Sequence, residues 1–280
     1  MKPINNIYIM SKNRPECHTA KLLNDMDYPG EWFICVQHDE EFLEEYIENY
    51  TEEKIIKYNY YNEIENSLFD NFNNERYGAS CARNGVHNFI KRYLDDERYW
   101  LLDDDITSFS KAKMNKPGSK KISEGEELEK ILYSIASIGK NANLEAVGIG
   151  ADINKFPLDK NTVEHSVYYI YNRRVNSNVS FHGRVADDYI FNVENYHHPL
   201  NYLMRFEMFN VKLKPFNYNQ IQQDGGMAET YRMWDTVNQR AYQILINPRL
   251  KILERTDGTL GNSNTMKTVC PKLIDEKWKK

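Results

Sequence analysis

Residues 81–106 read CARNGVHNFIKRYLDDERYWLLDDDI and combine a helix pattern, a strand pattern and three consecutive aspartates. Apolar side chains recur at three- and four-residue spacing over 81–94, which predicts an amphipathic helix. The apolar run Tyr99–Leu102 predicts a buried strand, and Asp103, Asp104 and Asp105 follow it directly. A helix joined by a short connection to a strand is the repeating unit of an α/β sheet.

The same alternation continues on both sides of this stretch. Apolar runs predict strands at 6–10, 32–36, 55–58, 146–149, 167–171, 206–212 and 250–253. Helix patterns lie at 15–23, 41–50, 123–139 and 227–241; in the third, Ser123 and Glu126 have capping-box spacing and Gly139 is the expected end. The pattern favours an α/β fold with a mainly parallel, doubly wound sheet, in one domain because no repeat or linker is visible.

Composition and charge restrict the class of protein. The chain has 280 residues, 41% of them hydrophobic, which is enough for a core. It has no apolar run near the roughly 18–20 residues of a membrane span, no signal-peptide pattern, and four cysteines far apart in sequence. We therefore expect a cytoplasmic protein with no membrane partner. The net charge of −5 excludes a generally basic nucleic-acid coat protein but not a local basic patch.

Such a basic patch follows the aspartates, in a predicted loop that contains Lys111, Lys113, Lys116, Lys120 and Lys121. The loop either follows a DNA backbone or is simply solvated.

The aspartate triplet is the strongest chemical signal. Three carboxylates at one strand end repel one another unless a positive group joins them, and a hard divalent cation with phosphate oxygens is the usual solution. Ligands of open α/β sheets bind beyond the carboxyl ends of the strands, where this triplet falls. If strand alternation continued, Asp103 and Asp105 would face one side and Asp104 the other. The alternative is a turn with solvated aspartates.

Other candidates for nucleotide binding also follow or flank predicted strands. Ser11 and Arg14 lie in the turn after the first strand and suit a ribose or base and a phosphate. Asp39 follows the second strand and either binds a nucleoside or caps the helix 41–50. Arg83 adds positive charge near a helix N-terminus, which attracts phosphate. Neither a dinucleotide-binding glycine pattern nor a P-loop lysine is present.

A second acidic pair, Asp187 and Asp188, lies far along the chain. One of these carboxylates can act as a base toward a hydroxyl nucleophile. His182, a candidate base, metal ligand or phosphate contact, precedes the pair together with Arg184. Further candidates on the substrate side are Gly148 and Gly150, which allow close approach, and Asp224 in a polar turn. A surface acidic turn is the alternative.

The order of these features resembles that of glycosyltransferases with the GT-A fold. Within that fold, YGASCARNGVHNFI (77–90) followed by YWLLDDDI (99–106) is similar to the TET-associated glycosyltransferases. That set is found largely in bacteriophages and is related to the enzyme that glucosylates hydroxymethyluracil in kinetoplastid DNA. The resemblance covers roughly residues 4–240.

The resemblance implies a Rossmann-like GT-A fold with a mixed sheet flanked by helices. It implies a nucleotide-sugar half at about 1–110, an acceptor half at about 111–255 and a polar tail at about 256–280. It also implies roles for single residues. Asp103 contacts the ribose or sugar, Asp105 with Asp103 binds Mn²⁺ or Mg²⁺, and Ser11, Arg14, Asp39, Arg83 and Asp104 hold the nucleotide.

On the acceptor side, Asp187 and Asp188 stand where relatives often show Glu-Asp, so either is a candidate base. The fold often supplies a third metal ligand from a C-terminal histidine, but no histidine follows His198 in this chain.

The implied reaction moves a sugar from a nucleotide sugar, expected to be UDP-linked, to a 5-hydroxymethylpyrimidine in DNA, with 5-hydroxymethylcytosine as the expected base. One alternative is a GT-A glycosyltransferase that acts on a glycan, lipid or protein. Another is a Mg²⁺-dependent nucleotidyltransferase, which would release pyrophosphate. A third is a DNA-binding or structural protein without activity. The sequence leaves the oligomeric state open.

Overall fold

The structure is a computed structural model of the whole chain. It describes residues 2–59, 79–112, 119–149, 170–177, 179–181, 191, 204–205, 250–251 and 272–273. Among these residues, no helix is both long and apolar enough to cross a membrane.

A mixed sheet of seven strands forms the centre of the fold, in the order β3-β2-β1-β4-β8-β7-β9. Its strands are β1 (Asn6–Met10), β2 (Trp32–Gln37), β3 (Ile55–Tyr58), β4 (Arg98–Asp103), β7 (Ala146–Gly148), β8 (Ile170–Arg174) and β9 (Met204–Arg205). The first four strands are mutually parallel, β8 runs antiparallel to β4 and β7, and β7 is parallel to β9. Only β8 opposes the other six strands of this sheet, so the mainly parallel sheet predicted from the sequence and the mixed sheet implied by the resemblance are both confirmed.

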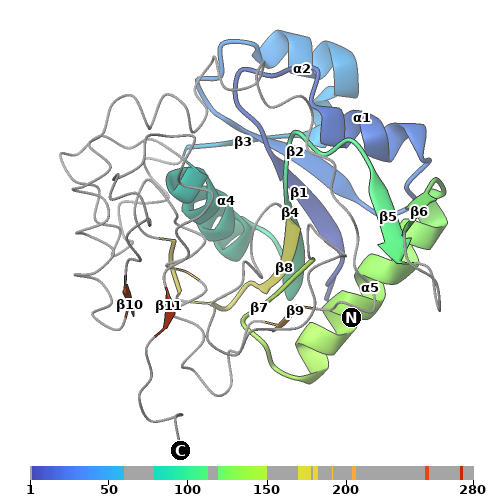
Figure 1. The fold of residues 1–280 in the computed structure, drawn as a ribbon. Helices are drawn as coiled ribbons and strands as arrows, with labels where there is room; N and C mark the ends of the chain where they lie inside the picture. Colours follow the sequence, from blue (N-terminus) through green and yellow to red (C-terminus); the bar gives the residue numbers. More distant parts are fainter. Residues whose placement is uncertain are drawn as a thin grey trace, which may run out of the picture.

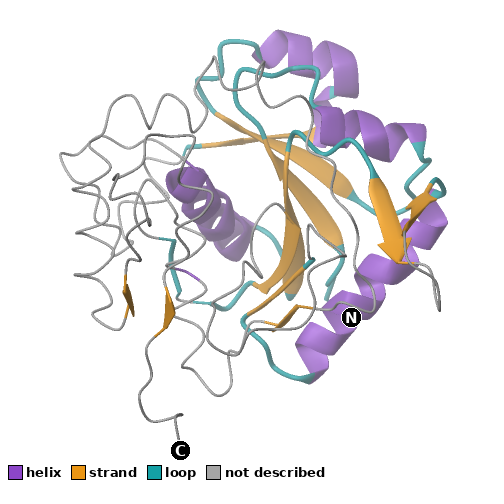
Figure 2. Cartoon of the chain, viewed as in Figure 1, coloured by secondary structure: helices purple, strands orange, loops and turns teal. Residues whose placement is uncertain are grey.

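Helices cover both faces of this sheet (Figure 1). The helices are α1 (His18–Asp25), α2 (Leu43–Tyr50), α4 (Ala79–Tyr93) and α5 (Gly125–Asn141), and η1 (Glu52–Lys54) is a short 3-10 turn. One core joins α1, α2 and α5 to a face of the sheet through side chains such as Leu23, Tyr46 and Leu132. A second core joins α4 to the opposite face through Val86 and Ile90. Two helix layers therefore enclose the sheet, as Figure 2 shows.

The alternation of side chains along the strands explains this division. Ile7 and Ile9 of β1 belong to the first core, whereas Tyr8 between them belongs to the second. In β4, Trp100 and Leu102 face the first core and Leu101 faces the second. Because both faces are buried, these strands are continuous apolar runs in the sequence.

The lysine-rich segment is not a simple loop. Its ends form the strands β5 (Phe109–Ala112) and β6 (Ser119–Ile122), which pair antiparallel and place Lys111 opposite Lys120. Phe109 and Ile122 are paired in this hairpin and fully buried, so the hairpin is anchored to the core. The predicted loop is therefore wrong at both ends, and Lys113 and Lys116 lie outside the described residues.

The predicted ends of α5 are also wrong. The N-cap is Glu124 with no side-chain cap hydrogen bond, so Ser123 and Glu126 do not form a capping box there. The helix continues through Gly139, where a Cβ would lie 2.7 Å from Val147 Cγ2. Gly139 therefore serves close packing of the helix on β7 rather than helix termination.

Other predicted elements match with small shifts or lie outside the described residues. The strands at 6–10 and 55–58 are confirmed at their predicted bounds, while the first helix starts at His18 rather than near Pro15. The strand predicted at 167–171 is observed at Ile170–Arg174. The strand at 206–212 and the helix at 227–241 lie outside the described residues. Near the predicted strand 250–253, β10 (Leu250–Lys251) pairs with β11 (Lys272–Leu273).

Candidate functional site

The site begins at the point where the strand order reverses. The chain passes from β1 outward to β2 and β3, and then returns to place β4 on the other side of β1. Ligands of open α/β sheets bind at such a switch point, beyond the carboxyl ends of the strands. Met10 pairs with Asp103 in the β1–β4 register, so the turn after β1 and the aspartate triplet lie side by side. We call Ser11, Arg14, Asp103, Asp104 and Asp105, together with Arg83 of α4, the donor edge.

Asp104 joins the two halves of the donor edge. Its Oδ2 accepts a hydrogen bond from Ser11 Oγ at 2.7 Å, and its Oδ1 accepts one from Arg14 Nη1 at 2.9 Å. The Asp104 side chain is only 7% exposed and that of Arg14 is 27% exposed, so this ion pair is largely shielded from water. Asp104 thus holds Ser11 and Arg14 next to the end of β4.

Helix α2 and Glu40, in the turn before it, hold the same turn from the other side. Tyr46 Oη lies 2.6 Å from Ser11 Oγ and accepts a hydrogen bond from the backbone amide of Arg14 at 3.0 Å. Glu40 Oε1 accepts one from the backbone amide of Asn13 at 2.9 Å. Asn13 has a φ of 54°, a left-handed conformation that asparagine tolerates better than most residues. The turn is therefore fixed before any ligand binds.

Asp103 faces α4, on the opposite side from the Ser11–Arg14 turn. Its Oδ1 lies 3.5 Å from Arg83 Nη2, and the Arg83 side chain is only 7% exposed. The backbone carbonyl of Asp103 accepts a hydrogen bond from Thr19 Oγ1 at 2.6 Å, and Thr19 Oγ1 accepts one from the amide of Ile106 at 3.0 Å. Thr19 thus fixes the backbone of the turn that contains all three aspartates.

Asp105 carries the clearest electrostatic signature of the triplet. Burial and the neighbouring charge of Asp104 raise the pKa of the Asp105 carboxyl to about 6, against a smaller opposing effect of Arg14. β4 ends at Asp103, and Asp104 and Asp105 lie in a turn, so the strand-alternation argument does not extend to them. Asp103 and Asp104 nevertheless have different neighbours. Asp104 contacts the turn after β1, whereas Asp103 contacts Arg83 of α4.

The donor edge has more negative than positive charge, which suits a cation. Three carboxylates meet the two guanidinium groups of Arg14 and Arg83. Within the described residues, no three His, Cys, Asp or Glu side chains are arranged to hold a metal by themselves. Mg²⁺ is commonly bound by one or two carboxylates together with substrate phosphates, so Asp103 and Asp105 fit a cation that arrives with a diphosphate.

Two further predicted residues lie on the same edge of the sheet. Asp39 lies in the turn after β2, and its side chain is 63% exposed. It does not cap α2, because the N-cap is Phe42 with no side-chain cap hydrogen bond. Gly148 is the last residue of β7, which runs in the same direction as β4, and it pairs with Tyr171 and Arg205. Roles for Asp39 and Gly148 in ligand binding stay predictions.

The acceptor-side candidates lie outside the described residues. These are Gly150, His182, Arg184, Asp187, Asp188 and Asp224. Phe181 and Phe191, which flank four of them in sequence, are described and fully buried. Their rings stack with centroids 4.2 Å apart. Phe181 and Phe191, ten positions apart in sequence, are therefore in direct contact.

Residues that the sequence did not single out complete the donor edge. Tyr46 and Thr19 each contact it through one hydroxyl, and Glu40 holds its backbone. In sequence, Tyr46 and Thr19 are ordinary helix residues, so no local signal distinguishes them. Glu40 was visible as one acid in a polar run that follows β2, but its contact with Asn13 depends on the fold.

Comparison with known protein families gives a match for most of the chain. A family model described as TET-Associated Glycosyltransferase matches residues 5–220, which is more than half of the chain and includes every residue of the donor edge. No curated protein matches the chain.

Proposed function

Because the chain belongs to the TET-associated glycosyltransferase family, we propose that it transfers a sugar from a nucleotide sugar to a modified base in DNA. Family membership makes it a sugar-transferring enzyme. The observation that supports the donor is the donor edge itself, where carboxylates and arginines meet at the switch point of the sheet. We propose a UDP-sugar as the donor and 5-hydroxymethylcytosine as the acceptor base.

Each residue of the donor edge has a role in this proposal. Arg14 and Arg83 stabilise the negative charge of the diphosphate, because guanidinium groups bind phosphate oxygens with paired N–H groups. The Ser11 hydroxyl and exposed Asp39 contact the nucleoside. Asp104 keeps Ser11 and Arg14 in place through its two hydrogen bonds.

Asp103 and Asp105 are the residues that would hold Mn²⁺ or Mg²⁺ on the diphosphate. When bound, the cation stabilises the charge that develops on the departing nucleoside diphosphate. Burial and, to a smaller extent, the charge of Asp104 raise the pKa of Asp105, and a bound cation would offset the repulsion between the two carboxylates.

The acceptor half of the proposal assigns Asp188 or Asp187 as the base. The carboxylate takes the proton of the hydroxymethyl group, and the freed oxygen forms a bond to the anomeric carbon of the sugar. The bond between that carbon and the diphosphate oxygen breaks, and its electron pair leaves with the nucleoside diphosphate. His182, Arg184, Gly148, Gly150 and Asp224 are proposed to contact the sugar or the base.

Nucleoside mass spectrometry after incubation with DNA tests this function. The protein is given Mn²⁺, one UDP-sugar at a time, and DNA that contains cytosine, 5-hydroxymethylcytosine or 5-hydroxymethyluracil. We expect a sugar mass only on a hydroxymethylated nucleoside, with release of UDP. Release of UDP without a modified nucleoside would overturn the DNA acceptor, and release of pyrophosphate would indicate a nucleotidyltransferase instead.

A further inference from the structure

One face of α4 holds the chain that precedes the acceptor-side candidates. Asn84, His87 and Lys91 are spaced three and four residues apart, so they lie on the same face of the helix. All three contact the segment 177–181 through side-chain hydrogen bonds. This segment leads directly into His182.

Asn84 makes the most specific of these contacts. Its Nδ2 donates to the backbone carbonyl of Phe181 at 2.8 Å, and its Oδ1 accepts from the backbone amide of the same residue, also at 2.8 Å. The side-chain amide thus pairs with both polar groups of one residue, as a neighbouring strand would. Asn84 is 2% exposed, so neither bond is replaced readily by water.

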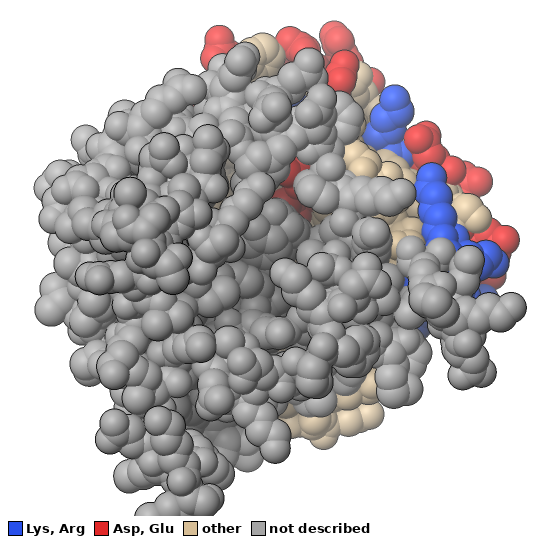
Figure 3. All heavy atoms as spheres, viewed as in Figure 1, with Lys and Arg blue, Asp and Glu red and all other residues tan. Residues whose placement is uncertain are grey.

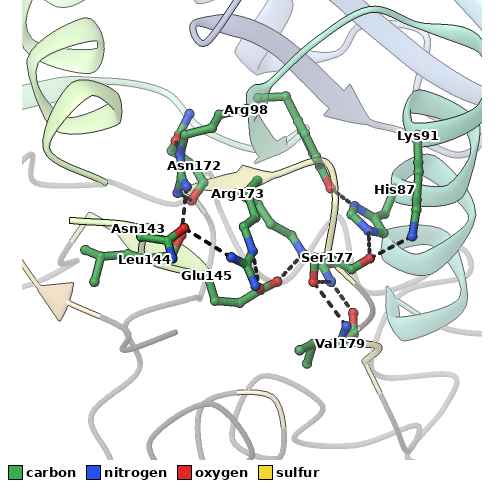
Figure 4. Close-up of polar contacts among 12 residues, drawn as sticks. His87, Lys91, Arg98, Asn143, Leu144, Glu145, Asn172, Arg173, Ser177 and Val179 are labelled. Atoms are coloured by element: carbon green, nitrogen blue, oxygen red, sulfur yellow. Dashed lines mark hydrogen bonds and ion pairs between the residues drawn. The ribbon is translucent and has the colours of Figure 1, made fainter. Parts of the chain in front are cut away.

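Other side chains fix the rest of the segment, as Figure 4 shows. Lys91 Nζ donates to the backbone carbonyl of Ser177 at 3.1 Å, and a ring nitrogen of His87 lies 3.2 Å from the same oxygen. From β8, Arg173 donates to Ser177 Oγ at 3.0 Å and to the backbone carbonyl of Val179. The segment is therefore held between α4 and β8.

The residue before Asn84 belongs to the donor edge. Arg83 Nη2 lies 3.5 Å from Asp103 Oδ1, and the Arg83 guanidinium carbon lies 5.4 Å from the centre of the Phe181 ring. Two consecutive residues of one helix therefore contact Asp103 and Phe181. Phe191, the next described residue along the chain, stacks on Phe181 at this point.

We propose that Asn84 is a positioning residue for sugar transfer, because it sets the place of the acceptor-side chain relative to the donor-edge aspartates. The expected effect on sugar transfer rests on the proposed function, whereas the contact between Asn84 and Phe181 does not. His182 is bonded directly to Phe181 in the chain, so a shift of Phe181 is passed on to the start of the acceptor-side candidates. Loss of the Asn84 contact should therefore disturb transfer to the acceptor and leave donor binding unchanged.

The test uses Asn84→Asp in the full chain. The aspartate keeps the acceptor for the Phe181 amide but cannot donate to the Phe181 carbonyl. We expect kcat for transfer to hydroxymethylated DNA to fall at least roughly tenfold, because misplaced reacting groups lose rate steeply. The Kd for UDP with Mn²⁺, measured by calorimetry, should stay within about twofold, since no donor-edge residue changes.

Two control variants separate this role from a general loosening of the helix. Val86→Ala removes buried methyl groups from the other core contact of α4 and should lower the melting temperature without the same loss of kcat. Asn24→Asp makes the same charge change at an exposed position of α1 and should behave as wild type. An equal loss of kcat in Val86→Ala at a matched melting temperature would overturn the positioning role.

A second measurement does not depend on the reaction. Hydrogen exchange of the peptide that contains residues 177–181 should be faster in Asn84→Asp, while the peptide that contains Asp103 should not change. Unchanged exchange at 177–181 would overturn the inference whatever the activity. An inactive wild type with faster exchange in the variant would instead overturn the proposed function and leave the positional contact standing.

Discussion

Two clusters of acidic residues and arginines lie on the same sheet and differ in charge balance. At the donor edge, Asp103, Asp104 and Asp105 meet Arg14 and Arg83. In the second, the Glu145 cluster, Glu145 pairs with Arg173 at 3.3 Å and with Arg174 at 3.0 Å (Figure 4). The first cluster has an excess of carboxylates, and the second has an excess of guanidinium groups.

The clusters also differ in their access to solvent. The side chains of Glu145 and Arg173 are both 0% exposed, and Arg173 lies 5.0 Å from the ring of Phe191. At the donor edge, the Asp103 side chain is 22% exposed. The Glu145 cluster is closed to solvent and its acid has two arginine partners, which serves the fold. The donor edge is more accessible and has more carboxylates than guanidinium groups, which suits a cation. Four predictions test this contrast.

The largest expected effect is at Asp105. Asp105→Asn removes a proposed cation ligand, so Mn²⁺-dependent transfer should fall by roughly a hundredfold or more. Stability should not fall, because burial and Asp104 already disfavour the charge of this carboxylate. Steady-state kinetics over a Mn²⁺ titration measure the loss of transfer, and urea unfolding measures the stability. Retained activity would remove Asp105 from the cation site.

Glu145→Gln should show the reverse pattern. Loss of this acid leaves two arginines near each other without their buried partner, which typically costs about 3–5 kcal/mol of unfolding free energy. Urea unfolding measures the cost, and calorimetry measures Kd for UDP with Mn²⁺ on the folded fraction, which should be unchanged. A loss of donor affinity without a loss of stability would contradict the division between the clusters.

A pH effect should come from His87, which lies next to the Glu145 cluster. Burial, and to a smaller extent the positive charge of Arg173, lower the pKa of His87 well below its usual value of 6.5. Between these two pKa values only the unfolded chain binds the proton, so stability should fall as the pH drops below about 6.5, by up to about 1.4 kcal/mol per pH unit. Thermal unfolding between pH 7.5 and pH 5 should show that the stability of His87→Gln depends less steeply on pH than that of the wild type. An identical slope in both proteins would assign the effect to other groups.

The smallest effect concerns DNA binding by the β5–β6 hairpin. Lys120 and Lys121 are exposed, whereas Lys111 pairs with Glu127. Figure 3 shows acidic and basic side chains interspersed over the described part of this face rather than one continuous basic patch. If the hairpin contacts phosphates, Lys120→Ala with Lys121→Ala should reduce the slope of log K against log salt by roughly 2.

The control for this prediction is Lys2→Ala. Lys2 pairs with Asp95 before β1 and β4 begin, at the opposite edge of the sheet from the donor edge. Its replacement should leave the salt slope for DNA unchanged. A lysine pair that changes the slope no more than Lys2 does would show that the hairpin is only solvated.

Local sequence patterns predicted the strands well and the tertiary contacts poorly. The bounds of β1 and β3 match because apolar runs between polar turns have few alternatives. The pairing of Asp104 with Ser11 and Arg14 was not predictable, since it depends on β4 entering the sheet beside β1. The contact between Asn84 and Phe181 spans 97 positions, and no local pattern marks it.

The errors have the same origin. Pro and Gly within 113–118 suggested a loop, but Phe109 and Ile122 are buried against the core and bring the two ends together as strands. Gly139 looked like a helix end, but Val147 and Arg98 approach the helix so closely there that a side chain would not fit. In both cases, packing against distant residues outweighed the local preference.

The antiparallel course of β8 also has a consequence for how the chain between β7 and β8 can be engineered. β7 ends at Gly148 and β8 begins at Ile170, with Gly148 paired to Tyr171 and Leu102 paired to Ile170. The intervening chain therefore leaves and re-enters the sheet beside the aspartates, with both of its attachment points set by backbone pairing. A stretch with fixed ends can be exchanged as a cassette between related enzymes. The sheet would keep its strand pairing while the length and composition of the exchanged stretch are varied.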